Sequence, residues 1–145
     1  MSTDPKHIRN VVLLGHSHCG KTSMIEAMLY ESKAITRRGT VEAGNTVSDF
    51  SDIEQERRGS LFSKLMHVNW KESKINIVDT PGSDDFVGEI LSSMKVSDLG
   101  IMVLNAAHGV EVGTELIWEY KEKFQLPGMF VINQCDHEKA DFDST

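Results

Sequence analysis

The segment that most constrains what this chain can fold into runs from Gly15 to Thr22 and reads G-H-S-H-C-G-K-T. It matches the pattern G-x-x-x-x-G-K-[ST], in which glycines allow a tight loop whose backbone N–H groups converge on phosphate oxygens. An apolar run over residues 8–14 precedes it, and apolar residues at helical spacing over residues 21–33 follow it. A strand, a glycine loop and a helix in this order predict a phosphate-binding loop at the carboxyl end of a strand.

Two side chains of this loop are expected to act on a bound nucleotide. Lys21 should reach the β- and γ-phosphates as a catalytic residue, and Thr22 should place its hydroxyl on Mg²⁺. The histidines and the cysteine of the loop are interpreted as loop residues rather than metal ligands, because no carboxylate or further cysteine lies at zinc-site spacing. Nucleotide contacts are predicted from the whole loop: Gly15, His16, Ser17, His18, Cys19, Gly20, Lys21 and Thr22.

Beyond the loop, short apolar runs alternate with patterns of helical spacing. Strands are predicted over residues 8–14, 61–70, 74–79, 99–106 and 129–133, and helices over residues 21–33, 84–95 and 110–125. This order predicts an α/β fold with a mostly parallel sheet and helices on both faces. Together with the phosphate-loop motif, it predicts the three-layer sandwich of P-loop NTPases. The run 61–70 alternates in polarity and turns at Glu72-Ser73, which predicts an antiparallel edge strand. Residues 35–59 show few apolar positions and are predicted to be a functional loop.

Composition narrows the classes of function. The chain has 145 residues, enough for one domain, and a formal net charge of −7, which argues against a broad nucleic-acid-binding face and against DNA as a partner. Its two cysteines lie too far apart in sequence to indicate a disulfide scaffold. The sequence shows neither a signal peptide nor an apolar run of about 18 residues, so we expect a cytoplasmic monomer that does not enter a membrane.

A second motif, D-T-P-G over residues 79–82, follows the strand predicted at 74–79. The carboxylate of Asp79 at a strand end can hold Mg²⁺ through the water shell of the ion. Gly82 can turn its N–H to the γ-phosphate, so that the loop senses whether this group is present. D-T-P-G alone is a common turn sequence, but the phosphate loop upstream favours the functional interpretation.

A third motif, N-Q-C-D over residues 133–136, follows the last predicted strand. The carboxylate of Asp136 can accept hydrogen bonds from N1–H and the 2-amino group of guanine, whereas adenine lacks both donors and would leave the carboxylate unpaired. Asn133 is expected to tie this loop to the phosphate loop. By itself N-x-x-D is explained equally well as a polar turn, and its place after D-T-P-G favours the guanine interpretation.

Together these motifs resemble the GTPase domain of translation elongation factor G, from about residue 8 to residue 142. The segments E-Q-E-R at 54–57, D-T-P-G-S-D-D-F-V-G at 79–88 and G-V-E-V-G-T-E at 109–115 are more similar to the elongation-factor-G-like paralogues than to the standard factor. The resemblance implies GTP or GDP and Mg²⁺ as ligands and the ribosome as a partner. It also implies that residues 35–59 form the first switch loop and that Ser60 replaces a Mg²⁺-binding threonine. We expect this loop to be unordered without nucleotide.

Three departures from the family pattern affect the expected activity. Ser83 stands where the standard factor has a histidine that orients the attacking water, and a serine would not stabilise the transition state similarly. Gln134 replaces the usual lysine of N-K-x-D, so weaker nucleotide affinity should follow. The chain stops at Thr145, before the last strand and helix of the family, so we expect a fragment of a longer multidomain translation factor, with residues 1–145 as its GTP-binding domain.

Two functions therefore stay open. The chain is either a ribosome-dependent GTPase module or a guanine-nucleotide-binding switch that hydrolyses GTP poorly or not at all, and Ser83 separates the two. An ATP-using P-loop enzyme is disfavoured by Asp136. A fourth alternative is that the isolated fragment binds no nucleotide.

Overall fold

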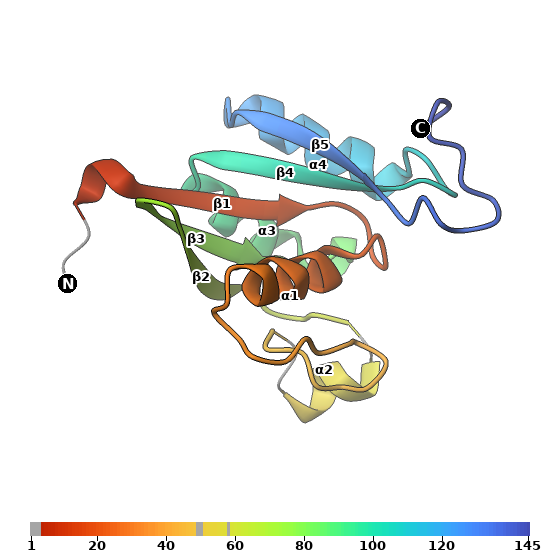
Figure 1. The fold of residues 1–145 in the computed structure, drawn as a ribbon. Coiled ribbons are helices and arrows are strands. Elements are labelled where there is room, and N and C mark those ends of the chain that lie inside the picture. Colours follow the sequence, from red (N-terminus) through yellow and green to blue (C-terminus); the bar gives the residue numbers. More distant parts are fainter. Residues whose placement is uncertain (1–3, 49–50, 58) are drawn as a thin grey trace.

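The computed structural model describes residues 4–48, 51–57 and 59–145. Its centre is a five-stranded sheet in the order β2-β3-β1-β4-β5, with β2 antiparallel to β3 and the other pairs parallel (Figure 1). The strands are β1 Ile8–Leu14, β2 Lys64–Trp70, β3 Ser73–Asp79, β4 Leu99–Asn105 and β5 Gly128–Asn133. The helices are α1 Lys21–Glu31, α2 Asp52–Arg57, α3 Val87–Lys95 and α4 Val112–Lys123, with short 3-10 helices η1 Pro5–His7 and η2 Asp84–Phe86.

The sheet is covered on both faces, as predicted from its continuous apolar runs. Alternate residues of β1 point to opposite faces, and both faces are buried. Val11 and Leu13 pack with Ile25 and Leu29 of α1, in a core that also takes residues of β2, β3 and β4. The next residues along β1 pack against α3, α4 and the segment after α4, in a second core of Val12, Leu14, Val78, Ile90, Met94, Met102, Leu104, Ile117 and Leu126. Figure 1 shows α1 on one side of the sheet and α3 and α4 behind it, so the predicted three-layer α/β fold is confirmed.

The parallel register brings the functional segments to one edge. Leu13 lies opposite Asp79, and Asn105 lies opposite Asn133, so β1, β3, β4 and β5 all end at the same side of the sheet. The loops that follow these strands therefore meet there, as ligand-binding loops of open α/β sheets do. No helix in the described part of the chain combines the length and apolar character that crossing a bilayer requires.

Most of the predicted elements differ from the observed ones by one to three residues at one end or both, and the two differences around β2 have a physical reason. Strand β2 begins at Lys64 rather than at residue 61, because the N–H groups of Leu61 and Phe62 donate to the carboxylate of Glu54 and that of Ser63 donates to Glu89. Backbone groups that are bonded to side chains are not available for a strand ladder. The hairpin turn is at residues 71–72 rather than 72–73, because Trp70 already pairs with Ser73.

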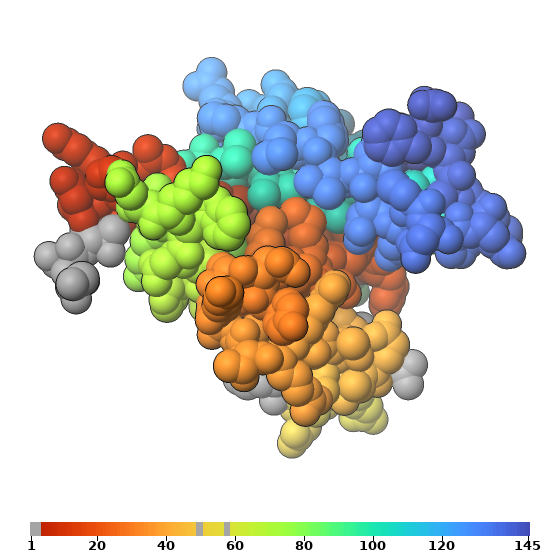
Figure 2. Space-filling model, in the orientation of Figure 1, coloured from red at the N-terminus to blue at the C-terminus, as the bar shows by residue number. Residues whose placement is uncertain are grey.

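The predicted loop at residues 35–59 contains a helix that the sequence did not indicate. Helix α2 lies within this range, and residues 49, 50 and 58 of the range lie outside the described part of the chain. Its residue Ile53 is 61% exposed whereas Glu54 is 1% exposed, so the helix buries a charged side chain instead of an apolar one. Figures 1 and 2 show this helix and the orange segment before it as a lobe beside α1.

Candidate phosphate-binding site

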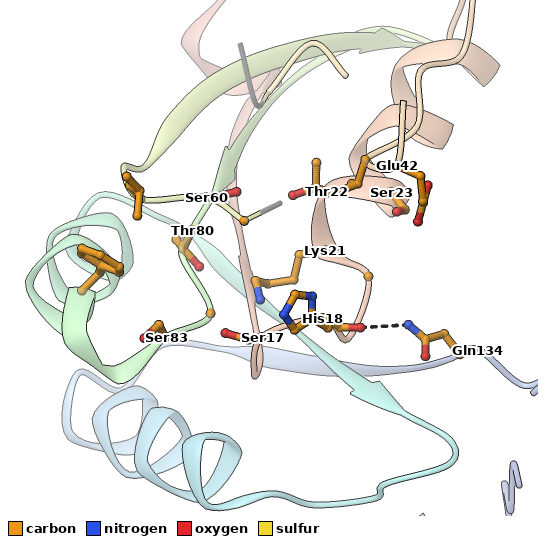
Figure 3. A pocket seen from close by; sticks show the side chains of 16 residues that line it. Ser17, His18, Lys21, Thr22, Ser23, Glu42, Ser60, Thr80, Ser83 and Gln134 are labelled. Atoms are coloured by element: carbon orange, nitrogen blue, oxygen red, sulfur yellow. Dashed lines mark hydrogen bonds between the residues drawn. The ribbon is translucent and has the colours of Figure 1, made fainter. Parts of the chain in front are cut away.

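A cavity of about 400 Å³ lies at the edge where the strands end. The phosphate loop and the start of α1 form one wall, with Lys21 and Thr22, and Thr80 and Ser83 face them from the segment after β3. Figure 3 shows the Lys21 side chain between these two walls. Of the other labelled residues, Ser17, His18 and Ser23 also belong to the loop and the start of α1, whereas Glu42, Ser60 and Gln134 come from three further segments.

The backbone of the phosphate loop adopts conformations that favour glycine. Gly15 has a φ of 138° and Gly20 a φ of 96°, and His18 between them has a φ of 62°. A β-carbon on Gly15 would lie 2.4 Å from the carbonyl oxygen of Val103. A β-carbon on Gly20 would lie 2.2 Å from the side-chain nitrogen of Asn133. Both glycines of the motif are therefore required by backbone conformation and by space.

Side chains hold the carbonyl groups of this loop. The ammonium of Lys21 donates to the carbonyl oxygens of Gly15, at 2.8 Å, and His16, at 2.9 Å. The carbonyl oxygens of Cys19 and His18 accept hydrogen bonds from Asn133, the last residue of β5, and from Gln134, which follows it. Because these carbonyl groups are turned toward side-chain donors, the loop can present its N–H groups to an anion.

The N-Q-C-D motif, which begins at the last residue of β5, supplies these two donors. Asn133 donates from Nδ2 to the carbonyl oxygen of Cys19 at 2.9 Å, so the predicted tie between the two loops is present in the structure. Gln134 donates from Nε2 to the carbonyl oxygen of His18 at 2.9 Å, the bond drawn in Figure 3. Asp136, the residue expected to read guanine, is exposed and lies outside the residues that line the cavity.

Gly82 lies directly against the loop. A β-carbon at this position would come within 2.5 Å of Nζ of Lys21 and 2.7 Å of the backbone nitrogen of Ser17. The D-T-P-G segment is therefore in contact with the two groups that the sequence assigns to the phosphates. The side chain of Thr80 fixes this segment, because its buried hydroxyl donates to the carbonyl oxygen of Leu13 at 2.6 Å.

Hydroxyl oxygens lie around the carboxylate of Asp79, which the sequence predicts to hold Mg²⁺. Asp79 is buried, and its Oδ2 accepts from the hydroxyl of Thr22 at 2.9 Å and from the hydroxyl of Ser48 at 2.5 Å. Hydroxyl and carboxylate oxygens are the hard ligands that Mg²⁺ prefers, so this donor set fits the ion. The resemblance assigned a switch-loop hydroxyl to Ser60, which lines the cavity, and Ser48 of the predicted switch loop also places a hydroxyl on Asp79.

Two buried glutamates anchor the segment between α1 and β2. Glu26 of α1 accepts from the backbone N–H groups of Gly39 and Val47, which lie on either side of the turn before Ser48. Glu54 of α2 pairs with Lys64 of β2 at 2.5 Å. Neither carboxylate was identified from the sequence. The burial of Glu26 could have been inferred only from its place next to Ile25 on the buried face of a predicted helix. For Glu54, the sequence offers nothing beyond its place in E-Q-E-R.

The environment of Glu54 lowers its pKa. Burial alone raises the pKa of this carboxyl, but hydrogen bonds from Lys64, from the N–H of Leu61 and from Ser51 outweigh burial and hold the pKa below its ordinary value of 4.5. The charged form of Glu54 is therefore the form that the fold stabilises.

Ser83 caps the 3-10 helix η2. Its hydroxyl oxygen accepts from the N–H of Asp85 at 3.4 Å and lies 3.2 Å from the carboxylate of the same residue. Ser83 also lines the cavity beside the phosphate loop, where its side chain serves as a helix cap.

The side chains of Cys19 and His16 in the loop pack against other parts of the protein. Cys19 is buried in the core under α1, and burial raises the pKa of its thiol despite the nearby charge of Lys21, so the thiol stays protonated. Cys19 and Cys135 are both free, as predicted. His16 Nε2 lies 3.7 Å from the carboxylate of Glu111, and a β-carbon on Gly113 would lie 2.5 Å from His16 Nδ1. The start of α4 therefore packs tightly against the loop.

Comparison with known proteins agrees with this geometry. Residues 6–145 match the family described as "Elongation factor Tu GTP binding domain". The chain superimposes with a TM-score of 0.91 on the crystal structure of a Thermus thermophilus protein designated ttk003000868, at 35% identity over 95% of this chain and 21% of that one.

Among curated proteins, the "Ribosome-releasing factor 2, mitochondrial" of Anopheles gambiae is 40% identical over 96% of this chain and 19% of its own length. The "Elongation factor G 2" of Borreliella burgdorferi is 37% identical over 93% of this chain and 20% of its own length. The resemblance to elongation factor G is thus confirmed, and this chain spans about a fifth of the relatives that it matches. The chain belongs to the family of elongation factor Tu GTP-binding domains.

Proposed function

We propose that this chain binds GTP and GDP together with Mg²⁺, as the nucleotide-binding domain of an elongation-factor-G-like GTPase that acts on the ribosome. The observation that carries the proposal is the phosphate loop. The carbonyl oxygens of Gly15, His16, His18 and Cys19 all accept hydrogen bonds from side chains, which leaves the loop N–H groups to form an anion site at the start of α1. The names of the relatives support the translational role.

Each part of the site would have a defined task. Lys21, held by two carbonyl oxygens, would keep one positive charge beside the β- and γ-phosphates. Thr22 and Asp79 would hold Mg²⁺, which offsets phosphate charge when bound. Gly82 lies against Lys21 and Ser17, so a γ-phosphate placed between them would have to shift the D-T-P-G segment. That contact would make the segment respond to the presence of the γ-phosphate.

Asp136 would provide the preference for guanine. Calorimetry of the chain with Mg²⁺ should show binding of GDP and weak or no binding of ADP. Asp136→Ala should weaken GDP binding, while Asp143→Ala, which removes the same charge from another exposed position of the C-terminal segment, should not. Equal affinity for GDP and ADP in the wild-type chain would contradict the guanine assignment.

A second candidate function is a switch module that hydrolyses GTP slowly, and the surroundings of Ser83 favour it. The Ser83 hydroxyl is engaged in capping η2 and cannot carry positive charge. Single-turnover GTP hydrolysis with ribosomes, comparing the wild-type protein with Ser83→His, separates the two functions. A large gain from the histidine supports the slow switch, whereas a fast wild-type rate with no gain supports a GTPase that does not need a histidine there.

A further inference from the structure

A short chain of amide groups connects the end of β4 to the phosphate loop. Asn105, the last residue of β4, is 5% exposed and donates from Nδ2 to Oε1 of Gln134 at 2.7 Å. Gln134 in turn donates from Nε2 to the carbonyl oxygen of His18. The loop is thereby linked through Gln134 to a buried strand end.

The direction of these hydrogen bonds is fixed at both ends by backbone groups. At one end, Oδ1 of Asn105 accepts from the backbone N–H of Ala107 at 2.8 Å, so Nδ2 has to face Gln134. At the other end, the carbonyl of His18 can only accept, so Nε2 of Gln134 has to face the loop. Neither amide can be reversed without placing two donors or two acceptors against each other.

A lysine at position 134 would not satisfy this arrangement. Its ammonium could donate to the carbonyl of His18, but it offers no acceptor to Nδ2 of Asn105. The buried amide of Asn105 would then face a second donor and lose its partner. This loss is costly because a buried polar group without a partner has no water to replace it.

We propose that Asn105 is a positioning residue that makes glutamine the matched residue at position 134, and that nucleotide affinity depends on the pair Asn105–Gln134 rather than on position 134 alone. The inference rests on the proposed binding of guanine nucleotides. It revises the sequence-based expectation that Gln134 simply weakens affinity by replacing lysine. In this chain the glutamine holds the loop, and Asn105 holds the glutamine.

The backbone conformation shows why the link matters. His18 has a φ of 62° and Gln134 a φ of 59°, so both residues joined by this hydrogen bond hold a left-handed conformation that side chains disfavour. Strained residues keep such conformations only when surrounding contacts hold them. Loss of the link should therefore let the loop relax away from the shape that gathers its N–H groups.

The test is a double-mutant cycle measured by calorimetry with Mg²⁺ and GDP. Asn105→Asp keeps the shape of the side chain but can no longer donate to Gln134, and we expect GDP affinity to fall about tenfold. Gln134→Lys alone should also weaken binding, by about the same factor. The double variant Asn105→Asp with Gln134→Lys should recover most of the affinity, because the lysine can donate both to the new carboxylate and to the carbonyl of His18.

Two further variants show whether a lower GDP affinity comes from the lost donor of Asn105, from the added charge or from a general loss of stability. Asn105→Ala removes the donor without adding a charge and should still weaken binding. Asn76→Asp changes a similar amide pair, in which Asn76 donates to Asn10 at 2.8 Å at the other end of the sheet, and should leave GDP affinity unchanged. If Asn105→Asp does not fold, the single variant Gln134→Lys tests the inference. A higher affinity for GDP in this variant than in the wild-type chain would overturn the role of Asn105.

A second measurement does not depend on nucleotide. Hydrogen exchange of the amides of residues 18–20 should be faster in Asn105→Asp than in the wild-type chain without GDP. Additive effects in the cycle, together with unchanged exchange, would overturn the role of Asn105. A wild-type chain that binds no GDP but shows the exchange effect would overturn the proposed function and leave the role of Asn105 in place.

Discussion

Replacing Gly20 by alanine should be among the most damaging glycine substitutions in the chain. The backbone of Gly20 has a φ of 96°, and an alanine in the left-handed region costs about 1–2 kcal/mol. Its β-carbon would also lie 2.2 Å from Nδ2 of Asn133, which has to move and release the carbonyl oxygen of Cys19. Leaving a buried carbonyl group without its hydrogen-bond donor costs about 1–3 kcal/mol of stability. We therefore expect Gly20→Ala to lower the free energy of unfolding by about 2–5 kcal/mol.

Two other glycines separate these contributions. Gly109 has a φ of 68° with open space around its β-position, so Gly109→Ala measures backbone strain alone, about 1–2 kcal/mol. Gly88 in α3 also has open space and shows no positive φ, so Gly88→Ala should stabilise the chain by about 0.5–1 kcal/mol.

Urea denaturation of the wild-type chain and the three variants gives the free energies, and GDP calorimetry gives the effect on the site. Gly20→Ala should lose more stability than Gly109→Ala, and of the three it alone should lose GDP affinity. If Gly20→Ala loses no more stability than Gly109→Ala, the contact between Gly20 and Asn133 does not constrain the loop.

Three further predictions concern carboxylates. The pKa of Glu54 in the folded protein lies below 4.5, so the charged carboxylate stabilises the fold above that pH, and this stabilisation is lost as the pH falls through the folded pKa. The variant Glu54→Gln should therefore show a smaller fall in the free energy of unfolding between about pH 6 and about pH 3. The same dependence of the free energy on pH in the variant and the wild-type chain would contradict this. Asp79→Asn should reduce the ability of Mg²⁺ to strengthen GDP binding by about 10- to 100-fold, measured by calorimetry with and without the ion, and a retained Mg²⁺ effect would exclude Asp79. Glu26→Ala should speed hydrogen exchange at the amides of Gly39 and Val47, and unchanged exchange there would mean that Glu26 does not anchor the segment.

Local motifs in the sequence predicted much of this molecule. The phosphate loop follows from the two glycines and Lys21, because the requirements of the loop are met within eight neighbouring residues. The layers follow from β1, whose successive residues enter opposite cores. The tie from Asn133 to the loop was also predicted, since strands that end at one edge bring their loops together.

Contacts between distant side chains could not be predicted in the same way. Ser48 meets Asp79 across 31 positions, and Asn105 meets Gln134 across 29, with no pattern of spacing to indicate either pair. Helix α2 was missed because it is only six residues long and is held by polar contacts of Glu54 instead of an apolar face. Such contacts depend on the tertiary arrangement, which overrides local propensity.

In the arrangement described above, side chains turn the carbonyl groups of the loop away and leave its N–H groups to bind phosphate. A titration of the ¹⁵N-labelled chain with Mg²⁺ and GDP, followed by NMR, tests it directly. The largest shifts should occur at the backbone amides of residues 16–22, in the loop and at the start of α1. Saturable binding that leaves these amides unchanged, or no binding, would contradict it.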